Sequence, residues 1–174
     1  MRGVLRLPRH VWLPVEQHLL ASPCERMAYL LARAGRWTDP WGRDTTDLLV
    51  RQALLIPDEA LRVQSAVRVE VDPAFTGEVL RACYETGMSL IDVHTHPFSH
   101  GPVWFSGHDE ANMLLTHAEF AANMPQDPPA TAASLVLGPG GLAGAWSPHP
   151  GELAPLTKVT LLDTTTSEVP LCAP

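Results

Sequence analysis

Two histidines separated by one residue stand in the stretch IDVHTHPFSHG, residues 91–101. If this stretch is a β-strand, His94 and His96 point to the same side, because side chains alternate between the two faces of a strand. Neutral imidazoles bind Zn²⁺ at about 2.0–2.1 Å. The pair is therefore a candidate part of a metal site, although H-x-H is short and two ordinary histidines would give the same pattern.

A third ligand is available in the sequence SGHD, which begins at Ser106. Asp109 falls in the first turn of a helix expected over 106–124, where the positive helix end favours an ionised carboxylate. Ser106 and Asp109 also fit a capping pair at a helix start, and that role is compatible with metal binding. His108 and, more remotely, Glu110 compete with Asp109 for the third position.

The letters IDVHTHP resemble the opening metal motif of the amidohydrolase barrels and the first motif of the PHP phosphoesterases. Both classes need a barrel after the motif to supply the remaining ligands. A (β/α)₈ barrel takes about 250 residues, whereas only residues 97–174 follow His96. The length excludes both classes.

Glu25, the HTHP sequence and the SGHD sequence together resemble the JAMM metalloprotease family, also called the MPN-plus or JAB domain. The family pattern is a glutamate on an early strand, then H-[ST]-H-P, then S-x-x-D. The resemblance runs from about Val15 to Trp146. This sequence departs from the family in two places: residues 97–108 put twelve residues between the second histidine and the aspartate, where the family has about ten, and the glycine common after the glutamate is absent.

The resemblance implies that His94, His96 and Asp109 bind Zn²⁺, that Glu25 is the general base, and that Ser106 stabilises the oxyanion. It implies a bacterial-type peptidase or isopeptidase that cleaves after the C-terminal tail of a ubiquitin-like protein, in precursor processing or in deconjugation. The expected partners are that protein or its conjugates, together with E1- or E2-like enzymes of the same pathway.

Five other residues near these motifs are candidates for a role in the site or in packing. Trp104 and Phe105, in the longer loop, could wall a substrate cleft and select a glycine tail, or could pack under the loop. Asp92 shares the strand face of the histidines, but the family motifs do not require it. His117 falls on the apolar stripe of its helix and is predicted to be a core histidine, and Cys24 is predicted to be a packed residue.

Two functions of other classes remain as alternatives. The first is a catalytically inactive MPN-type scaffold that binds other proteins, although such a scaffold would not need the complete residue set. The second is a RadC-like metal protein linked to DNA. A net charge of −7 disfavours nucleic-acid binding, which needs a Lys/Arg patch.

The composition indicates a soluble, cytoplasmic protein. Hydrophobic residues make up 45% of the chain; three scattered cysteines do not form a disulfide framework. The N-terminus lacks the apolar segment of a signal peptide, and the sequence has no apolar run near the roughly 20 residues that span a bilayer. We therefore expect no membrane partner.

The predicted fold class is mixed α/β, with residues 1–174 in a single domain of cytidine-deaminase-like JAMM architecture. A curved mixed β-sheet would be flanked by helices, and residues from about 160 to 174 would form a terminal strand and tail. Asp72, Pro73 and Gly87 mark the start and end of the clearest helix, and Pro14 suits the first turn of another. Helices are expected at 12–22, 72–87 and 106–124, strands at 27–35, 47–56, 66–71, 89–96, 131–138, 142–146 and 158–163, and a loop at 36–46.

Overall fold

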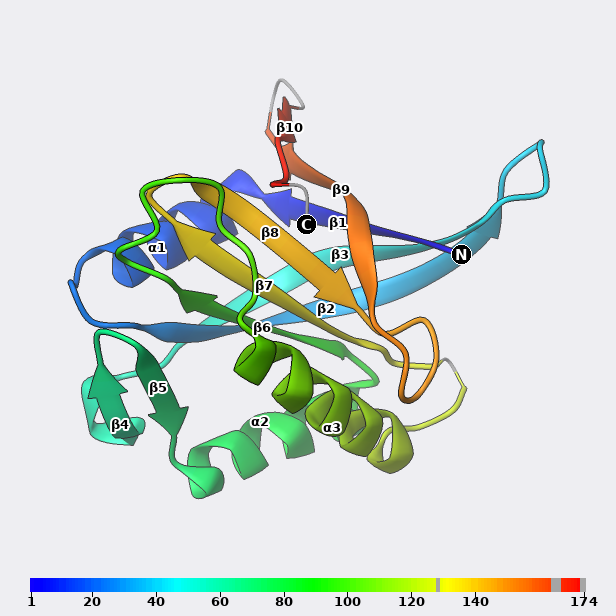
Figure 1. The fold of residues 1–174 in the computed structure, drawn as a ribbon. Helices are drawn as coiled ribbons and strands as arrows, with labels where there is room; N and C mark the ends of the chain where they lie inside the picture. Colours follow the sequence, from blue (N-terminus) through cyan, green and yellow to red (C-terminus); the bar gives the residue numbers. More distant parts are fainter. Residues whose placement is uncertain (128, 164–166, 173–174) are drawn as a thin grey trace.

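The computed structural model describes residues 1–127, 129–163 and 167–172 (Figure 1). Its helices are α1 (Arg9–Leu20), α2 (Pro73–Thr86) and α3 (Gly107–Asn123), with a short 3₁₀ turn at Asp58–Ala60. Its strands are β1 (Arg2–Pro8), β2 (Met27–Thr38), β3 (Asp44–Leu55), β4 (Leu61–Ser65), β5 (Arg68–Val71), β6 (Ser89–Thr95), β7 (Ala132–Gly138), β8 (Gly141–Trp146), β9 (Ala154–Leu162) and β10 (Ser167–Val169).

Seven of the strands form a closed barrel. The order β1-β3-β2-β6-β7-β8-β9 returns to its start, because β1 pairs in parallel with both β3 and β9. β10 pairs with β9 outside this ring, and β4 and β5 form a separate two-stranded sheet. Strands β6 and β7 are parallel neighbours, and β2 runs antiparallel to β6 on the other side.

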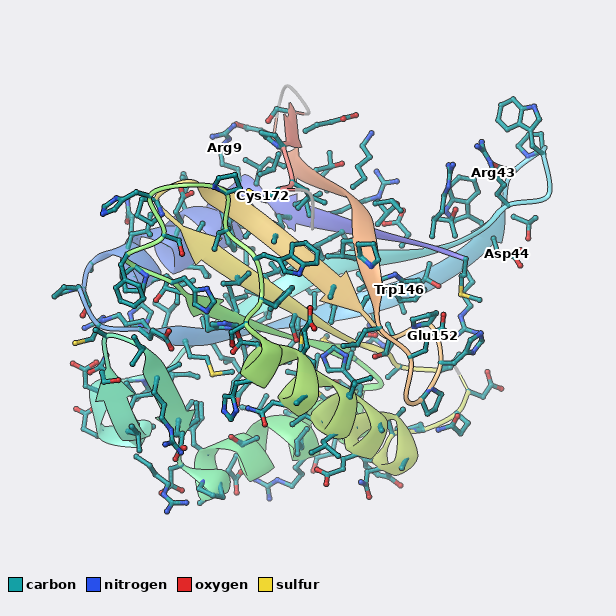
Figure 2. All side chains as sticks on the ribbon, in the orientation of Figure 1. Arg9, Arg43, Asp44, Trp146, Glu152 and Cys172 are labelled. Atoms are coloured by element: carbon teal, nitrogen blue, oxygen red, sulfur yellow. The ribbon has the colours of Figure 1, made fainter. Side chains whose placement is uncertain are left out.

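The first strand closes the barrel, and its sequence explains why it fits there. Gly3, Leu5 and Leu7 are buried and alternate with more exposed residues such as Arg6, which is the period of a strand with one buried face. Trp146 fills the space beside this strand; it is 1% exposed (Figure 2). A Cβ at position 3 would lie 2.4 Å from the Trp146 indole nitrogen, so the packing requires glycine.

The expected α/β architecture, an open curved sheet flanked by helices, is therefore wrong. The chain is mostly β, and its main sheet closes on itself. One reason is the N-terminal strand β1, which the sequence interpretation did not include. A second reason is that residues 36–46 are not simply a loop: β2 continues to Thr38 and β3 begins at Asp44, so the two strands are long enough to span the barrel.

The helices agree more closely with the sequence. The Asp72 carboxylate caps α2 by accepting a hydrogen bond from the Ala74 N–H at 2.7 Å, and Gly87 ends the helix with φ of 63°. Both roles are confirmed. Helix α1 begins three residues earlier than expected, so Pro14 lies inside the helix and not in its first turn.

The helices divide the apolar residues into an interior and an exterior cluster. Trp12, Val15 and Leu19 of α1 pack with the side chains that point into the barrel. Helices α2 and α3 instead cover the outer face of β2, β6 and β7 (Figure 1). The predicted terminal strand and tail include β10, whereas residues 164–166 and 173–174 lie outside the described part. Within the described part of the chain, none of the helices has the length and apolar character needed to cross a membrane.

Candidate metal centre

His94 near the end of β6 and His96 just beyond it lie on the outer face of the barrel, beside the first turn of α3. Ile91 and Val93 belong to the interior cluster, so the alternating residues, including His94, point outward. His96 lies just beyond the strand, and its N–H donates to the Leu137 carbonyl at 2.9 Å, which continues the pairing with β7. The two imidazole rings therefore lie side by side, with centroids 5.1 Å apart.

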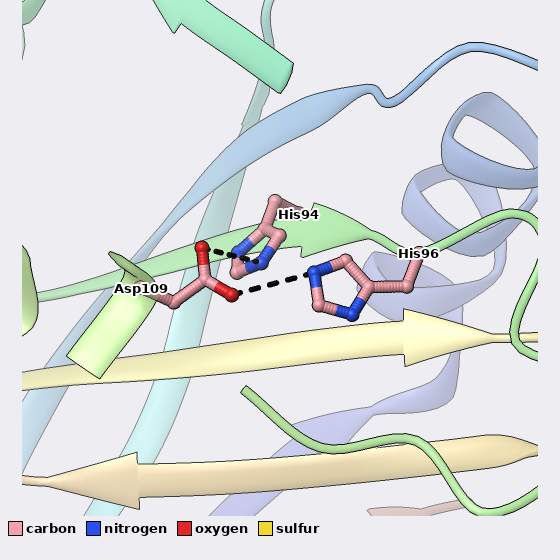
Figure 3. Close-up of side chains that lie close together, drawn as sticks. All are labelled: His94, His96 and Asp109. Carbon is pink, nitrogen blue, oxygen red and sulfur yellow. Dashed lines mark ion pairs between the residues drawn. The ribbon is translucent and has the colours of Figure 1, made fainter. Parts of the chain in front are cut away.

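Asp109 is held opposite the histidines by a capping box at the start of α3. The Ser106 hydroxyl accepts from the Asp109 N–H at 3.2 Å, and Asp109 Oδ2 accepts from the Ser106 N–H at 2.7 Å. These reciprocal bonds fix the carboxylate without help from the histidines. Oδ1 lies 3.6 Å from His94 Nε2 and Oδ2 lies 3.4 Å from His96 Nε2 (Figure 3).

The geometry of His94, His96 and Asp109 fits a zinc ion. Their ligand atoms all lie within 4.8 Å of one another. Tetrahedral coordination at the usual zinc–ligand distances places neighbouring ligand atoms about 3.4 Å apart, close to the 3.4 and 3.6 Å found here. Two imidazoles and one carboxylate are also a typical zinc donor set, with a fourth position left for water or substrate.

The Nε2 atom of His94 supplies independent support for a metal ion. It is buried and has no hydrogen-bond partner among the described residues; its separation of 3.6 Å from Asp109 is too long for a hydrogen bond. Other buried side-chain atoms of the described residues, such as Trp146 Nε1, also lack a partner, so the evidence for an ion is that this nitrogen faces a carboxylate and a second histidine. A metal ion between this nitrogen and the carboxylate would give the nitrogen a partner.

Glu25 stands beside this group, placed by the chain segment that enters β2. Its N–H donates to the Ser65 carbonyl at 2.8 Å, at the end of β4. The next residue, Arg26, donates its N–H to Thr95 Oγ1 at 2.8 Å, which ties this segment to the histidine strand. The Glu25 side chain is buried, with 6% exposure of the residue, and its Oε1 lies 4.0 Å from His96 Nε2.

The charges around the centre favour a cation. Burial raises the pKa of Glu25, an effect that His94 and His96 partly offset. Burial alone would also raise the pKa of Asp109, but contacts with both histidines hold it well below its ordinary range. Burial alone would lower the pKa of His94, yet Asp109 and Asp92 raise it overall. Two carboxylates thus lie beside two imidazoles, and a metal ion there would stabilise the carboxylates and coordinate the rings in their neutral form.

The two competing ligands of the sequence analysis lie outside the group. His108 is exposed, and its Nε2 lies 3.1 Å from the Asn112 amide nitrogen. Glu110 is also exposed and accepts from Trp104 Nε1 at 3.4 Å. Asp109 is the residue of the SGHD sequence that faces both histidines.

The longer loop before α3 packs against the centre. Phe105 is 6% exposed, and its ring centroid lies 6.1 Å from that of His94. Trp104 is partly exposed and meets Phe105 edge-on at 5.6 Å. Phe105 therefore supports the His94 ring from one side.

Cys24, which precedes Glu25, is a half-buried free thiol.

A shallow groove of about 380 Å³ is lined by residues that are close in sequence to Glu25 and His96, but not by the residues of the centre themselves. Pro23, two residues before Glu25, and Pro97, directly after His96, both line it, together with Leu19. The walls of the groove and the reactive side chains thus belong to the same chain segments.

His117 and Asp92 belong to a second polar group, in the interface between α3 and the barrel. His117 is 3% exposed and its two ring nitrogens contact the Ser134 and Ser147 hydroxyls at 2.9 and 2.8 Å. The prediction of a satisfied core histidine is confirmed. The sequence interpretation missed Ser134 and Ser147; for Ser134 the available signal was one serine within the apolar stretch AASLVLG.

No family model matches this chain, and the curated proteins contain no match to its sequence. The functional conclusion therefore depends on the geometry of the site.

Proposed function

We propose that the chain is a zinc-dependent metallopeptidase of the JAMM type. It would hydrolyse the peptide or isopeptide bond that follows the C-terminal tail of a ubiquitin-like protein. The observation that carries the proposal is the unpaired, buried Nε2 of His94, which faces Asp109 and lies in one group with His96, next to the buried carboxylate of Glu25. A ligand set and an adjacent base are the two parts that metal-assisted hydrolysis needs.

In this proposal His94, His96 and Asp109 hold the ion. A zinc ion bound there would act as a Lewis acid that lowers the pKa of water and polarises the scissile carbonyl. Glu25, outside the ligand group, accepts the proton of the attacking water and later delivers it to the leaving amine. Its raised pKa suits both transfers, because a general acid–base works best with a pKa near the operating pH.

Ser106 supplies a hydrogen-bond donor at the same end of α3. Its oxygen already accepts from the Asp109 N–H, so the hydroxyl proton stays available to donate. We assign this proton to the oxyanion that develops on the substrate carbonyl. The cap and the oxyanion contact use different parts of one hydroxyl group.

The substrate class is inferred from the resemblance and from the form of the surface. The groove along Pro23 and Pro97 is shallow, and it suits an extended chain better than a folded domain. The free thiols of all three cysteines fit a reducing compartment, so we infer that the protein acts in the cytoplasm.

Zinc content and cleavage of defined fusions test the proposal. We expect one zinc per chain by elemental analysis. We also expect cleavage of a reporter fused after a ubiquitin-like protein ending in Gly-Gly, with little cleavage when bulky residues replace the glycines or when the substrate is unfolded casein. Full zinc occupancy without cleavage of any substrate would instead support the scaffold alternative.

The Glu25→Gln variant tests the assignment of the base. It should keep its zinc and lose roughly 10²–10⁴-fold in rate. The matched control is Glu85→Gln, an exposed carboxamide substitution on α2, which should change neither quantity. Loss of zinc in Glu25→Gln would make Glu25 a ligand and not the base.

A further inference from the structure

A buried chain of hydrogen bonds links α3 to the barrel wall. Ser134 of β7 donates its hydroxyl proton to Asp92 Oδ1 at 2.6 Å. The Ser134 oxygen must then accept from His117 Nε2, 2.9 Å away, so His117 carries a proton on Nε2. The direct separation of His117 Nε2 from Asp92 Oδ1 is 3.9 Å, which leaves Ser134 as the bridge between them.

The other ring nitrogen extends the chain to the end of β8. His117 Nδ1 lies 2.8 Å from the Ser147 hydroxyl. The Ser147 carbonyl accepts from Thr131 Oγ1 at 2.9 Å, and its N–H donates to the Ala132 carbonyl at 3.1 Å. The histidine is thus joined to two separate strands through both nitrogens.

These residues are unsuited to nucleophilic catalysis. In a Ser–His–Asp triad the serine donates its proton to the histidine, whereas here Ser134 donates to Asp92. Ser134 is 0% exposed and His117 is 3% exposed, so a substrate has no route to the hydroxyl. These residues can hold α3 and the barrel in position, but they are not arranged to react with a substrate.

The chain of bonds has a mechanical consequence at the metal centre. Asp109 and His117 lie on one helix, eight residues apart, which is about 12 Å along the axis. The other buried contacts of α3, including Met113 and Phe120, are apolar, and apolar contacts are not directional. A slip of one residue would turn the helix by about 100° and carry Asp109 away from the histidines.

The chain of hydrogen bonds ends at Asp92, which lies on β6, the same strand as His94. Asp92 is two residues before His94 and on the same face of β6, by the alternation of the strand. Asp92 and the ligand His94 therefore share one rigid element, just as His117 and the ligand Asp109 share α3.

We propose that Asp92, Ser134, His117 and Ser147 form a positioning network that sets the register of α3 on the barrel and so holds Asp109 opposite His94 and His96. His117 is its central positioning residue and takes no part in the reaction. The inference rests on the proposed metal centre, because Asp109 needs this placement only if it binds the same metal ion as the histidines.

Zinc affinity of the network variants, measured by competition with a chromophoric chelator, tests the inference. His117→Leu should weaken zinc binding by roughly 10–100-fold, the usual effect of losing a group that orients a metal ligand. Ser134→Ala removes only the bridge and should weaken binding in the same direction but less. If His117→Leu does not fold, the Ser134→Ala variant tests the inference in its place.

A matched control separates positioning from general destabilisation. Phe120→Leu alters a buried α3 contact outside the network; it should lower stability and leave zinc affinity unchanged. Equal zinc affinity of wild type, His117→Leu and Ser134→Ala would overturn the inference, as would equal weakening by Phe120→Leu. Zinc-binding wild-type protein without hydrolysis would remove the proposed function alone, whereas a wild type that binds no zinc would remove both.

Discussion

Two buried histidines, His94 on β6 and His117 on α3, differ in whether their ring nitrogens have hydrogen-bond partners. Both ring nitrogens of His117 have serine partners, whereas His94 Nε2 is buried without a partner among the described residues. The first arrangement is complete in the protein alone. The second leaves one ring nitrogen open, and a metal ion in front of Asp109 would occupy it in the proposed centre.

If His94 binds a metal ion, as we propose, this difference separates a ligand histidine from a structural one. Burial is the same for both, at 8% exposure for His94 and 3% for His117, and so does not separate them. The number of buried ring nitrogens without a hydrogen-bond partner does separate the two histidines, because an unpaired buried polar atom costs about 1–3 kcal/mol. A protein tolerates such a cost where a bound ligand removes it.

The largest expected effect is loss of zinc from variants of the centre. His94→Ala and Asp109→Ala should each weaken zinc binding by more than the roughly 100-fold upper range for residues that only orient ligands. His108→Ala, the adjacent exposed histidine, is the control and should bind as wild type. Chelator competition measures all three.

The opposite result would redraw the centre. Zinc retained in Asp109→Ala and lost in His108→Ala would make His108 the third ligand, in which case α3 must adopt another register in the loaded protein. The comparison between the two buried histidines would then fail as well, because it assumes the register described here.

The sequence predicted which side chains lie together better than it predicted the fold that carries them. Strand alternation was enough to pair His94 with His96, and the S-x-x-D spacing was enough to place Asp109 in a capping box, because both are local rules. Closure of the barrel was not local: it depends on β1 pairing with β9, about 150 residues away. The Ser134–His117 contact spans only 17 residues, but it joins α3 to β7 through tertiary packing, so His117 could be predicted as buried but its partners could not be named.

The hydroxyl of Ser106 extends the comparison to catalysis. Ser106→Ala should cost about 1 kcal/mol of stability as a lost helix cap, whereas Ser106→Gly should cost only a few tenths. If the hydroxyl also stabilises the oxyanion, both variants should lose roughly 10²–10³-fold in kcat. Urea unfolding and kinetics on the same preparations separate the two roles.

The outcome for Ser106→Gly decides the assignment. Near wild-type activity in this variant would leave Ser106 as a cap alone. The oxyanion donor would then have to come from another group near the centre.

The stability of the metal-free protein gives a smaller contrast between the two histidines. His117→Leu leaves the Ser147 hydroxyl and the Ser134 oxygen without their histidine partner and should cost about 1–3 kcal/mol. His94→Leu removes an atom that has no partner in the first place, so its cost should stay below about 1 kcal/mol. Urea denaturation in the presence of a chelator measures both; equal costs would show that the unpaired nitrogen of His94 carries no penalty.

The smallest expected effect is the pH dependence that Glu25 gives to the metal-free protein. Burial raises the pKa of Glu25 above its ordinary value of 4.5 in the folded state, so the folded protein binds this proton more tightly than the unfolded chain. The stability contributed by Glu25 is therefore fully present below pH 4.5 and is lost as pH rises through the folded pKa. Glu25→Gln lacks this loss, so its free energy of unfolding, relative to wild type, should increase from pH 4.5 upward and then level off.

Asp109, whose pKa is lowered, acts in the opposite direction but only near and below its ordinary value of 3.8, so the two effects are separated by pH. Urea denaturation of chelated wild type and Glu25→Gln at intervals between pH 4.5 and 8 measures the difference, with Glu85→Gln as the exposed control. If the difference in free energy of unfolding between Glu25→Gln and wild type does not change across this range, the Glu25 carboxylate is as well solvated as an exposed one. Burial would then impose no cost on the charge of Glu25, and the contrast with the hydrogen-bonded network around His117 would be lost.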